Sequence, residues 1–156
     1  MKIAAVVILY NPTASTLEHI KSYSEVISKT YVFDNTEEGA PIRDKLSVLT
    51  GIEYHHDRKN EGLPKRLNEA ANLAMKDGFD WLLTMDQDST FSQGLFTKYA
   101  ACCDGFYGKE KVAMFGTTYE KNKTTPVETC QFAEVDNLIT SGTLLNLSLF
   151  KMIGNF

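Results

Sequence analysis

Residues 81–90 read WLLTMDQDST, an apolar run that stops at two aspartates, Asp86 and Asp88, separated by one glutamine. A continuous apolar run of this length is typical of a strand buried on both faces of a sheet. Asp is common in turns for local reasons, but two like charges this close repel each other and gain from a cation between them. The stretch therefore predicts a buried strand that carries two carboxylates to a polar site.

The composition favours one folded domain. The chain has 156 residues, of which 43% are hydrophobic, and a net charge of -4. Its lysines and arginines are scattered, which argues against a nucleic-acid interface or an anionic-membrane surface. No apolar stretch approaches the roughly 20 residues that span a bilayer, so no transmembrane segment is expected.

The cysteines show neither a metal-binding nor a redox spacing. There are three, Cys102, Cys103 and Cys130. An odd number with two adjacent members favours reduced thiols and a cytoplasmic location. Cys102 and Cys103 fall on an expected helix, where small apolar packing is their ordinary role.

Runs with strand character alternate with segments of helical period along the whole chain. Strands are expected at 3–9, 31–33, 52–55, 81–85 and 112–115, and helices within 17–27, 42–49, 64–78 and 95–99. This alternation predicts an α/β domain with a mainly parallel sheet.

Polar residues follow the first four expected strands. In open α/β sheets, ligands bind beyond the carboxyl ends of the strands. The residues at those ends are Tyr10 and Asn11, Asp34 and Asn35, Asp57, Arg58 and Asn60, and Asp86 and Asp88. Taken alone, each of these residues is as compatible with an ordinary turn as with a binding role. If the strands are adjacent and parallel, these side chains converge on one crevice.

The pair Asp86 and Asp88 suits a hard divalent cation, because carboxylate oxygens are hard ligands. A calcium loop of the helix-loop-helix type is disfavoured, because the twelfth residue counted from Asp86 is Thr97 and not a glutamate. Two carboxylates leave most of an octahedral shell open. We therefore expect Mn²⁺ or Mg²⁺ that takes its other ligands from substrate phosphates and water.

Four stretches together resemble a known family. VVILYNP, VFDN, NEGLPKRLNEAANLAMKDGFDWLLTMDQDS and LITSGTLLNLSLFKMIG resemble the nucleotide-sugar-binding half of a family 2 glycosyltransferase of the GT-A fold, most closely the rhamnosyltransferase-like branch. The resemblance implies a Rossmann-like, mainly parallel sheet flanked by helices over residues 1–156. It also implies a chain that ends before the acceptor-side catalytic base, which is expected beyond Phe156.

The implied activity is transfer of a sugar, rhamnose in this branch, from a dTDP- or UDP-linked donor to an acceptor hydroxyl, with inversion and metal assistance. The implied acceptor is a saccharide or lipid-linked saccharide in cell-surface polysaccharide synthesis. The resemblance places the reaction in the cytoplasm, with the full-length protein peripheral at the inner membrane face.

The resemblance also implies residue roles. Asp34 contacts the nucleobase, and a carboxylate there favours uracil or thymine over cytosine because it accepts from an imide N–H. Asp86 faces the ribose and donor sugar, and Asp88 holds the metal on the diphosphate. The other implied substrate contacts are Tyr10, Asn11, Asn60, Gly62, Ser141 and Gly142.

The helix that begins near Pro64 presents free N–H groups to an anion, and Gly62 permits close backbone approach. Lys65 and Arg66 either add positive charge there or form a solvated first turn of the helix. The sequence leaves both interpretations open.

Other polar clusters are weaker candidates. No general base is assigned, because Glu128, Glu134 and Asp136 are each more typical of solvated loops. The run His55, His56 and Asp57 alternates along a strand and favours a structural or surface role.

Two alternative functions remain. Residues 86–90, DQDST, also fit the D-x-D-x-T motif of haloacid-dehalogenase-like phosphatases, with Asp86 as the nucleophile. That motif normally follows the first strand of its domain, however, and here it follows about four α/β elements. A non-catalytic nucleotide-binding fragment is the second alternative.

Overall fold

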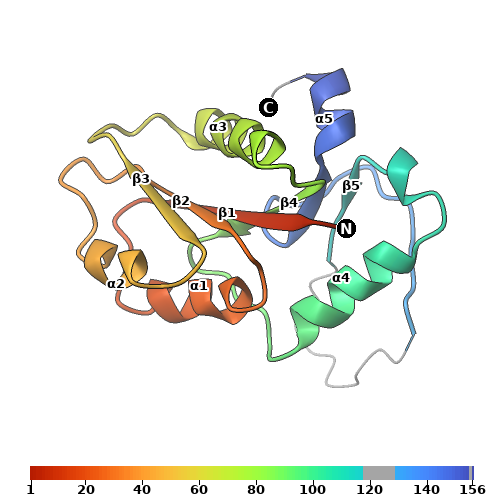
Figure 1. Cartoon of the computed structure of the whole chain (residues 1–156), viewed down its shortest axis with the longest axis horizontal. Coiled ribbons are helices and arrows are strands. Elements are labelled where there is room, and N and C mark those ends of the chain that lie inside the picture. Colours follow the sequence, from red (N-terminus) through yellow and green to blue (C-terminus); the bar gives the residue numbers. More distant parts are fainter. Residues whose placement is uncertain (118–128, 155) are drawn as a thin grey trace.

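The computed structural model describes residues 1–117, 129–154 and 156 (Figure 1). These residues form a six-stranded sheet in the order β3-β2-β1-β4-β6-β5. The strands are β1 (Ile3–Leu9), β2 (Thr30–Asp34), β3 (Ile52–His56), β4 (Trp81–Asp86), β5 (Met114–Phe115) and β6 (Thr143–Asn146). The first four run parallel, and β6 pairs antiparallel to both β4 and β5. The predicted α/β class with a mainly parallel sheet is confirmed.

Helices cover both faces of the sheet, and Figure 1 shows α3 and α5 on one face and α1, α2 and α4 on the other. The helices are α1 (Thr16–Ser24), α2 (Arg43–Ser47), α3 (Leu63–Lys76), α4 (Leu95–Gly105) and α5 (Leu147–Ile153), with a 3-10 helix at Lys109–Lys111. Each face has its own apolar core, one containing Ile20, Leu46 and Phe96 and the other containing Leu67 and Phe150. Because both faces are covered, the central strand β1 is apolar along its whole length.

Helix α3 packs closely on the sheet because its buried face is built from small residues. Ala70, Ala71 and Ala74 are fully buried against the sheet. The helix begins after Gly62, whose φ of 75° lies in the left-handed region, and Pro64 occupies its first turn. The loop between β3 and α3 therefore lies at the carboxyl edge of the sheet, where α3 begins.

The cysteine prediction is wrong in part. Cys102 of α4 forms a disulfide with Cys130, whose Cα atom lies 5.6 Å away. Cys103 is the free thiol, and it is fully buried, as expected for a packing residue. Sequence spacing could not reveal the pair, because α4 and the segment before β6 meet only in the folded chain.

The remaining differences concern element ends. Helix α1 ends at Ser24, although its apolar period continues to Ile27, and the predicted strand at 112–115 is reduced to Met114–Phe115. In the described part of the chain, no helix is long and apolar enough to cross a membrane.

Strand order places a topological switch point between β1 and β4. From β1 the chain adds β2 and β3 on one side, and β4 then pairs with β1 on the other side. The carboxyl ends of β1 and β4 at such a switch point are where ligands bind in sheets of this kind.

Candidate functional site

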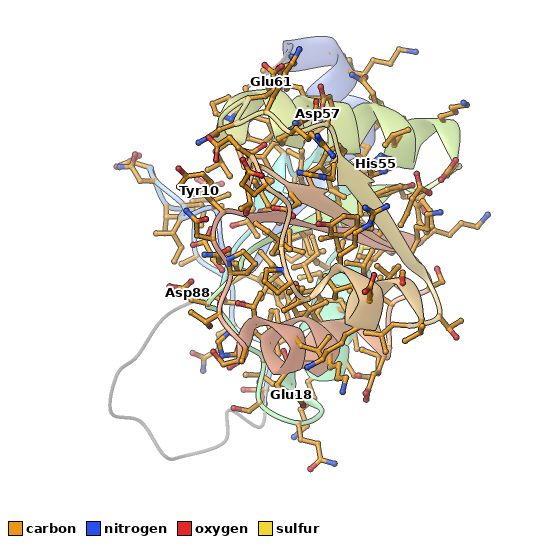
Figure 2. All side chains as sticks on the ribbon, turned by 90° about the vertical axis from the view of Figure 1, so that its left-hand side faces the viewer. Tyr10, Glu18, His55, Asp57, Glu61 and Asp88 are labelled. Carbon is orange, nitrogen blue, oxygen red and sulfur yellow. A yellow bond between two sulfur atoms is a disulfide. The ribbon has the colours of Figure 1, made fainter. Side chains whose placement is uncertain are left out.

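The candidate site lies at the carboxyl ends of β1 and β4. The parallel pairing of these strands ends with Ile8 opposite Asp86. Tyr10 follows β1, is 47% exposed, and appears in Figure 2 on the same edge of the molecule as Asp88. Two of the predicted polar groups therefore lie at the same edge of the sheet, on either side of the switch point.

Asp86 and Asp88 form the acidic part of the site. Asp86 is the last residue of β4, and its carbonyl accepts a hydrogen bond from the Ser89 N–H at 3.2 Å, which closes a turn. Both aspartates are exposed. Partial burial and the neighbouring Asp88 carboxylate raise the pKa of Asp86. The two ionised carboxylates therefore repel each other, and a divalent cation between them would reduce this repulsion.

The donor set fits a cation that is shared with a ligand. Among the residues the structure describes, no group of three or more His, Cys, Asp or Glu side chains could hold a metal alone. An ion at Asp86 and Asp88 would complete its shell with water and phosphate oxygens, which is the usual arrangement for Mg²⁺.

Gln87 connects this turn to β1. Its Oε1 accepts from the Tyr10 N–H at 3.0 Å, and its Nε2 donates to the Tyr10 carbonyl at 3.1 Å. The side chain therefore binds both backbone groups of one residue on the neighbouring strand end.

Asp34, the predicted nucleobase contact, is the last residue of β2 and is only 1% exposed. Its Oδ1 accepts from the Thr36 N–H at 2.9 Å, and its Oδ2 accepts from the Ala40 N–H at 2.7 Å and from the Tyr54 hydroxyl. The carboxylate thus holds the loop after β2, and because it is buried, a contact with a nucleobase requires the groups that cover it to move.

The loops after β1 and β2 are tied together through Thr36. Its Oγ1 accepts from the Asn11 N–H at 2.9 Å, and Asn11 itself has a φ of 47°, a conformation that Asn adopts more readily than most residues. The Thr36 carbonyl accepts from His56 Nε2 at 2.8 Å. His56 therefore acts in the structural role that its sequence position predicts.

Arg66 of α3 joins the ends of β2 and β3. Its Nε donates to Asn35 Oδ1 at 2.9 Å, and its Nη2 donates to Asp57 Oδ1 at 2.6 Å and to the Lys59 carbonyl at 3.2 Å. The guanidinium lies 5.6 Å from the centre of the Phe33 ring, and Arg66 is 5% exposed. Arg66 is therefore a buried organising residue and not part of a solvated first turn.

Lys65 and the loop before α3 are more loosely connected to the site. Lys65 is exposed and pairs with Glu61 at 2.8 Å. Asn60 is also exposed, and its Oδ1 accepts from the Gly62 N–H at 3.1 Å. Asn60 and Gly62 thus form a local turn, which reaches the other strand ends through Lys59 and Arg66.

Ser141 and Gly142 meet the far side of β4. The Asp86 N–H donates to Ser141 Oγ at 3.1 Å, and the Gly142 N–H donates to the Thr84 carbonyl at 2.8 Å. Ser141 is 3% exposed. The structure therefore brings the predicted Ser141 region to the backbone of the first aspartate.

The weaker candidates show no contact with Asp86 or Asp88 among the described residues. Glu134 and Asp136 are exposed in an irregular segment, and Glu128 lies outside the described residues. His55 stacks on Phe33 with ring centres 4.6 Å apart. These contacts give no indication of a general base.

Two hollows lie among the described residues, at other places than the two aspartates. A hollow of about 640 Å³ beside the end of β3 is lined by residues that include Phe33, His55, Asp57 and Arg66. A second, of about 500 Å³, lies at the opposite ends of β1 and β4, beside Met1 and Trp81. Neither is lined by Asp86 or Asp88.

Comparison with known proteins supports the fold. No protein-family model matches the chain, and no curated protein matches it. Solved structures of Staphylococcus aureus TarS do match. TarS 1-349 in complex with UDP-GlcNAc is 16% identical, with a TM-score of 0.69, over 98% of this chain and 47% of that one. TarS 1-349 in complex with UDP is 17% identical, with a TM-score of 0.62, over 98% of this chain and 49% of that one.

A third structure, of TarS, is 17% identical, with a TM-score of 0.68, over 97% of this chain and 29% of that one. The chain thus spans about half of the TarS 1-349 structures and a smaller share of the TarS structure. At this level of identity the likeness establishes a shared α/β fold, which extends over nearly all of the chain.

Proposed function

We propose that the chain is the nucleotide-sugar-binding part of a glycosyltransferase that uses a nucleoside-diphosphate sugar. The observation that carries the proposal is that the turn with Asp86 and Asp88 lies at the switch point between β1 and β4, where its Gln87 binds the backbone of Tyr10. The TarS structures with UDP-GlcNAc and UDP share this fold, which supports a uridine diphosphate as the first ligand to test.

Each loop at this edge would have a defined task. Asp86 and Asp88 would hold Mn²⁺ or Mg²⁺, and the cation when bound would neutralise charge on the departing diphosphate. The loops that Asp34 and Arg66 organise would contact the nucleoside, and Ser141 would hold the backbone of Asp86 toward the donor sugar. The general base is left unassigned.

The finer parts of the proposal rest on the sequence resemblance. They are rhamnose as the sugar, inversion at the anomeric carbon, and a saccharide or lipid-linked saccharide as the acceptor. A cytoplasmic location belongs with them, although the Cys102–Cys130 disulfide weighs against it because such bonds are rare in that compartment.

The phosphatase alternative gains no support. Its motif would follow β4, in the middle of the chain, and Thr90 is exposed. Trapping of a phosphoaspartate on Asp86 would revive it. A non-catalytic nucleotide-binding domain remains compatible with the site, and measurement of sugar transfer or donor hydrolysis separates it from an enzyme.

Calorimetric titration tests the proposal directly. UDP and dTDP are each titrated with and without Mn²⁺ into the wild type, into Asp88→Asn, and into Asp136→Asn as a control on an exposed loop. We expect Mn²⁺ to strengthen nucleotide binding by tenfold or more in the wild type and control, and much less in Asp88→Asn. Equal binding by all three proteins would overturn the assignment.

A further inference from the structure

Gln87 occupies an unusual place in the acidic turn. It lies between two aspartates in sequence. Its side chain forms two hydrogen bonds with the backbone of Tyr10, the residue that follows β1, at 3.0 and 3.1 Å. A glutamine amide offers one acceptor and a donor group in the same plane, so it can satisfy an N–H and a C=O of the same residue together.

These bonds replace a backbone pairing that the turn removes. The ladder between β1 and β4 ends at Ile8 and Asp86, and the Ser89 N–H then donates to the Asp86 carbonyl as the chain turns. Backbone from β4 therefore no longer reaches Tyr10. The Gln87 side chain extends the connection between the two strand ends past the last backbone pair.

Helix α1 holds the same turn from its other side. His19 Nδ1 lies 3.0 Å from the Gln87 carbonyl, and because a carbonyl oxygen only accepts, Nδ1 carries the proton. One turn along the helix, Ser22 Oγ accepts from the Phe91 N–H at 3.1 Å. The segment from Gln87 to Phe91 is thus held at both ends by α1.

Gln87 is therefore the junction of two sets of contacts. On one side Tyr10 leads to Asn11, whose N–H is bound by Thr36 of the loop after β2. On the other side are the two carboxylates that flank Gln87 in the turn, and His19 binds the Gln87 carbonyl between them. A shift at Gln87 would move the β1 loop relative to the carboxylates at the switch point.

We propose that Gln87, supported by His19, is a positioning residue that makes binding of a nucleoside diphosphate and of its divalent cation cooperative. The inference rests on the proposed function and adds to it the coupling between the β1 loop and the carboxylate turn. Removal of the amide separates the two, so each ligand loses part of the advantage that the other provides.

The test measures that coupling. UDP is titrated with and without Mn²⁺, and the ratio of the two dissociation constants gives the coupling factor. Gln87→Met keeps the length of the side chain but removes both hydrogen bonds, and we expect it to reduce the factor by about tenfold. Gln93→Met, the same change at an exposed glutamine in the loop before α4, should leave the factor unchanged.

A second pair of variants separates positioning from simple stability. His19→Asn can place an amide donor near the position of Nδ1, whereas His19→Leu removes it. We expect His19→Leu to lower the coupling factor and His19→Asn to restore most of it. This pair addresses the same junction if Gln87→Met fails to fold.

Two results would overturn the inference, and they differ in what they imply for the proposed function. An unchanged coupling factor in Gln87→Met and His19→Leu, with only a lower melting temperature, would leave Gln87 a structural residue and the proposed function intact. A wild type that binds UDP neither with nor without Mn²⁺ would overturn the proposed function and this inference with it.

Discussion

Arg66 of α3 and Asp57 after β3 form a direct ion pair, with Nη2 2.6 Å from Oδ1. The two partners differ in environment, because the Arg66 side chain is 6% exposed and that of Asp57 is 47% exposed. The buried guanidinium also binds Asn35 and the Lys59 carbonyl, so the pair fixes the ends of β2 and β3 relative to α3.

This pair predicts an acid-sensitive contribution to stability. The hydrogen bond from Arg66 lowers the pKa of Asp57 below its ordinary value of 3.8. Because the folded state favours the ionised carboxylate, its stabilisation is present above the ordinary pKa and is lost as the pH falls through the lowered value. We expect Asp57→Asn to reduce the free energy of unfolding at neutral pH, and to change it progressively less as the pH falls below 3.8 and through the lowered pKa.

Urea unfolding at a series of pH values measures the effect. Asp136→Asn, on an exposed loop, is the control and should change the free energy of unfolding little at any pH. The interpretation fails if Asp57→Asn and Asp136→Asn give the same dependence on pH.

The glycines that precede β3 and follow α3 give a prediction about backbone geometry. Gly51 has a φ of 80°, and a Cβ there would lie 2.8 Å from the Ser28 carbonyl oxygen. Gly78 has a similar φ of 78°, but a Cβ there would meet no atom within 4 Å. Gly78→Ala should therefore cost about 1 kcal/mol from the left-handed backbone alone. Gly51→Ala should cost at least about 2 kcal/mol, because the carbonyl must also move.

Chemical denaturation of both variants checks this difference. Equal losses for Gly51→Ala and Gly78→Ala would show that the contact with Ser28 relaxes without cost.

The disulfide gives a prediction that needs no mutation. The oxidised protein should show no reactive thiol when folded, because Cys103 is fully buried, and one thiol after unfolding without reductant. Burial raises the pKa of the Cys103 thiol to about 12, which further suppresses its reactivity in the folded state. After reduction and unfolding, all three cysteines should react.

Reduction should also lower the stability. The disulfide joins residues 28 positions apart, and a loop of that size corresponds to about 3.6 kcal/mol in the free energy of unfolding. Cys130→Ser should reproduce the loss and should no longer respond to reductant. Three reactive thiols in the unfolded, unreduced protein would show that the pair does not form.

The sequence predicted those parts of the fold that depend on local pattern. The apolar run before Asp86 identified β4, and the alanines of α3 identified a helix packed on the sheet. The burial of Arg66 could not be predicted in this way. Its acceptors follow the ends of two other strands and reach it only in the folded chain. The same limit applies to the disulfide, whose partners are distant in sequence.

The candidate site was likewise predicted only where it depends on local pattern. Chain position was sufficient to identify Asp86, Asp88 and Tyr10 as strand-end residues. The role of Gln87 was missed. No local pattern signals it, because Gln87 and Asp88 lie in a turn and its partner Tyr10 is 77 residues away in the sequence.

Asp34 provides the last prediction, which separates recognition of the nucleobase from support of the loop. The Asp34 carboxylate accepts from two backbone N–H groups and from Tyr54, and burial and this hydrogen bond raise the pKa of Tyr54, so its hydroxyl remains a donor at neutral pH. Tyr54→Phe removes one donor and should cost about 1 kcal/mol in the free energy of unfolding.

If Asp34 also accepts from a pyrimidine imide, Asp34→Asn should weaken UDP binding and improve CDP binding, because an amide can donate to cytosine N3. Titration of both variants with UDP and CDP measures the two effects. A parallel loss of affinity for UDP and CDP in Asp34→Asn, with Tyr54→Phe unaffected, would limit Asp34 to holding the loop after β2.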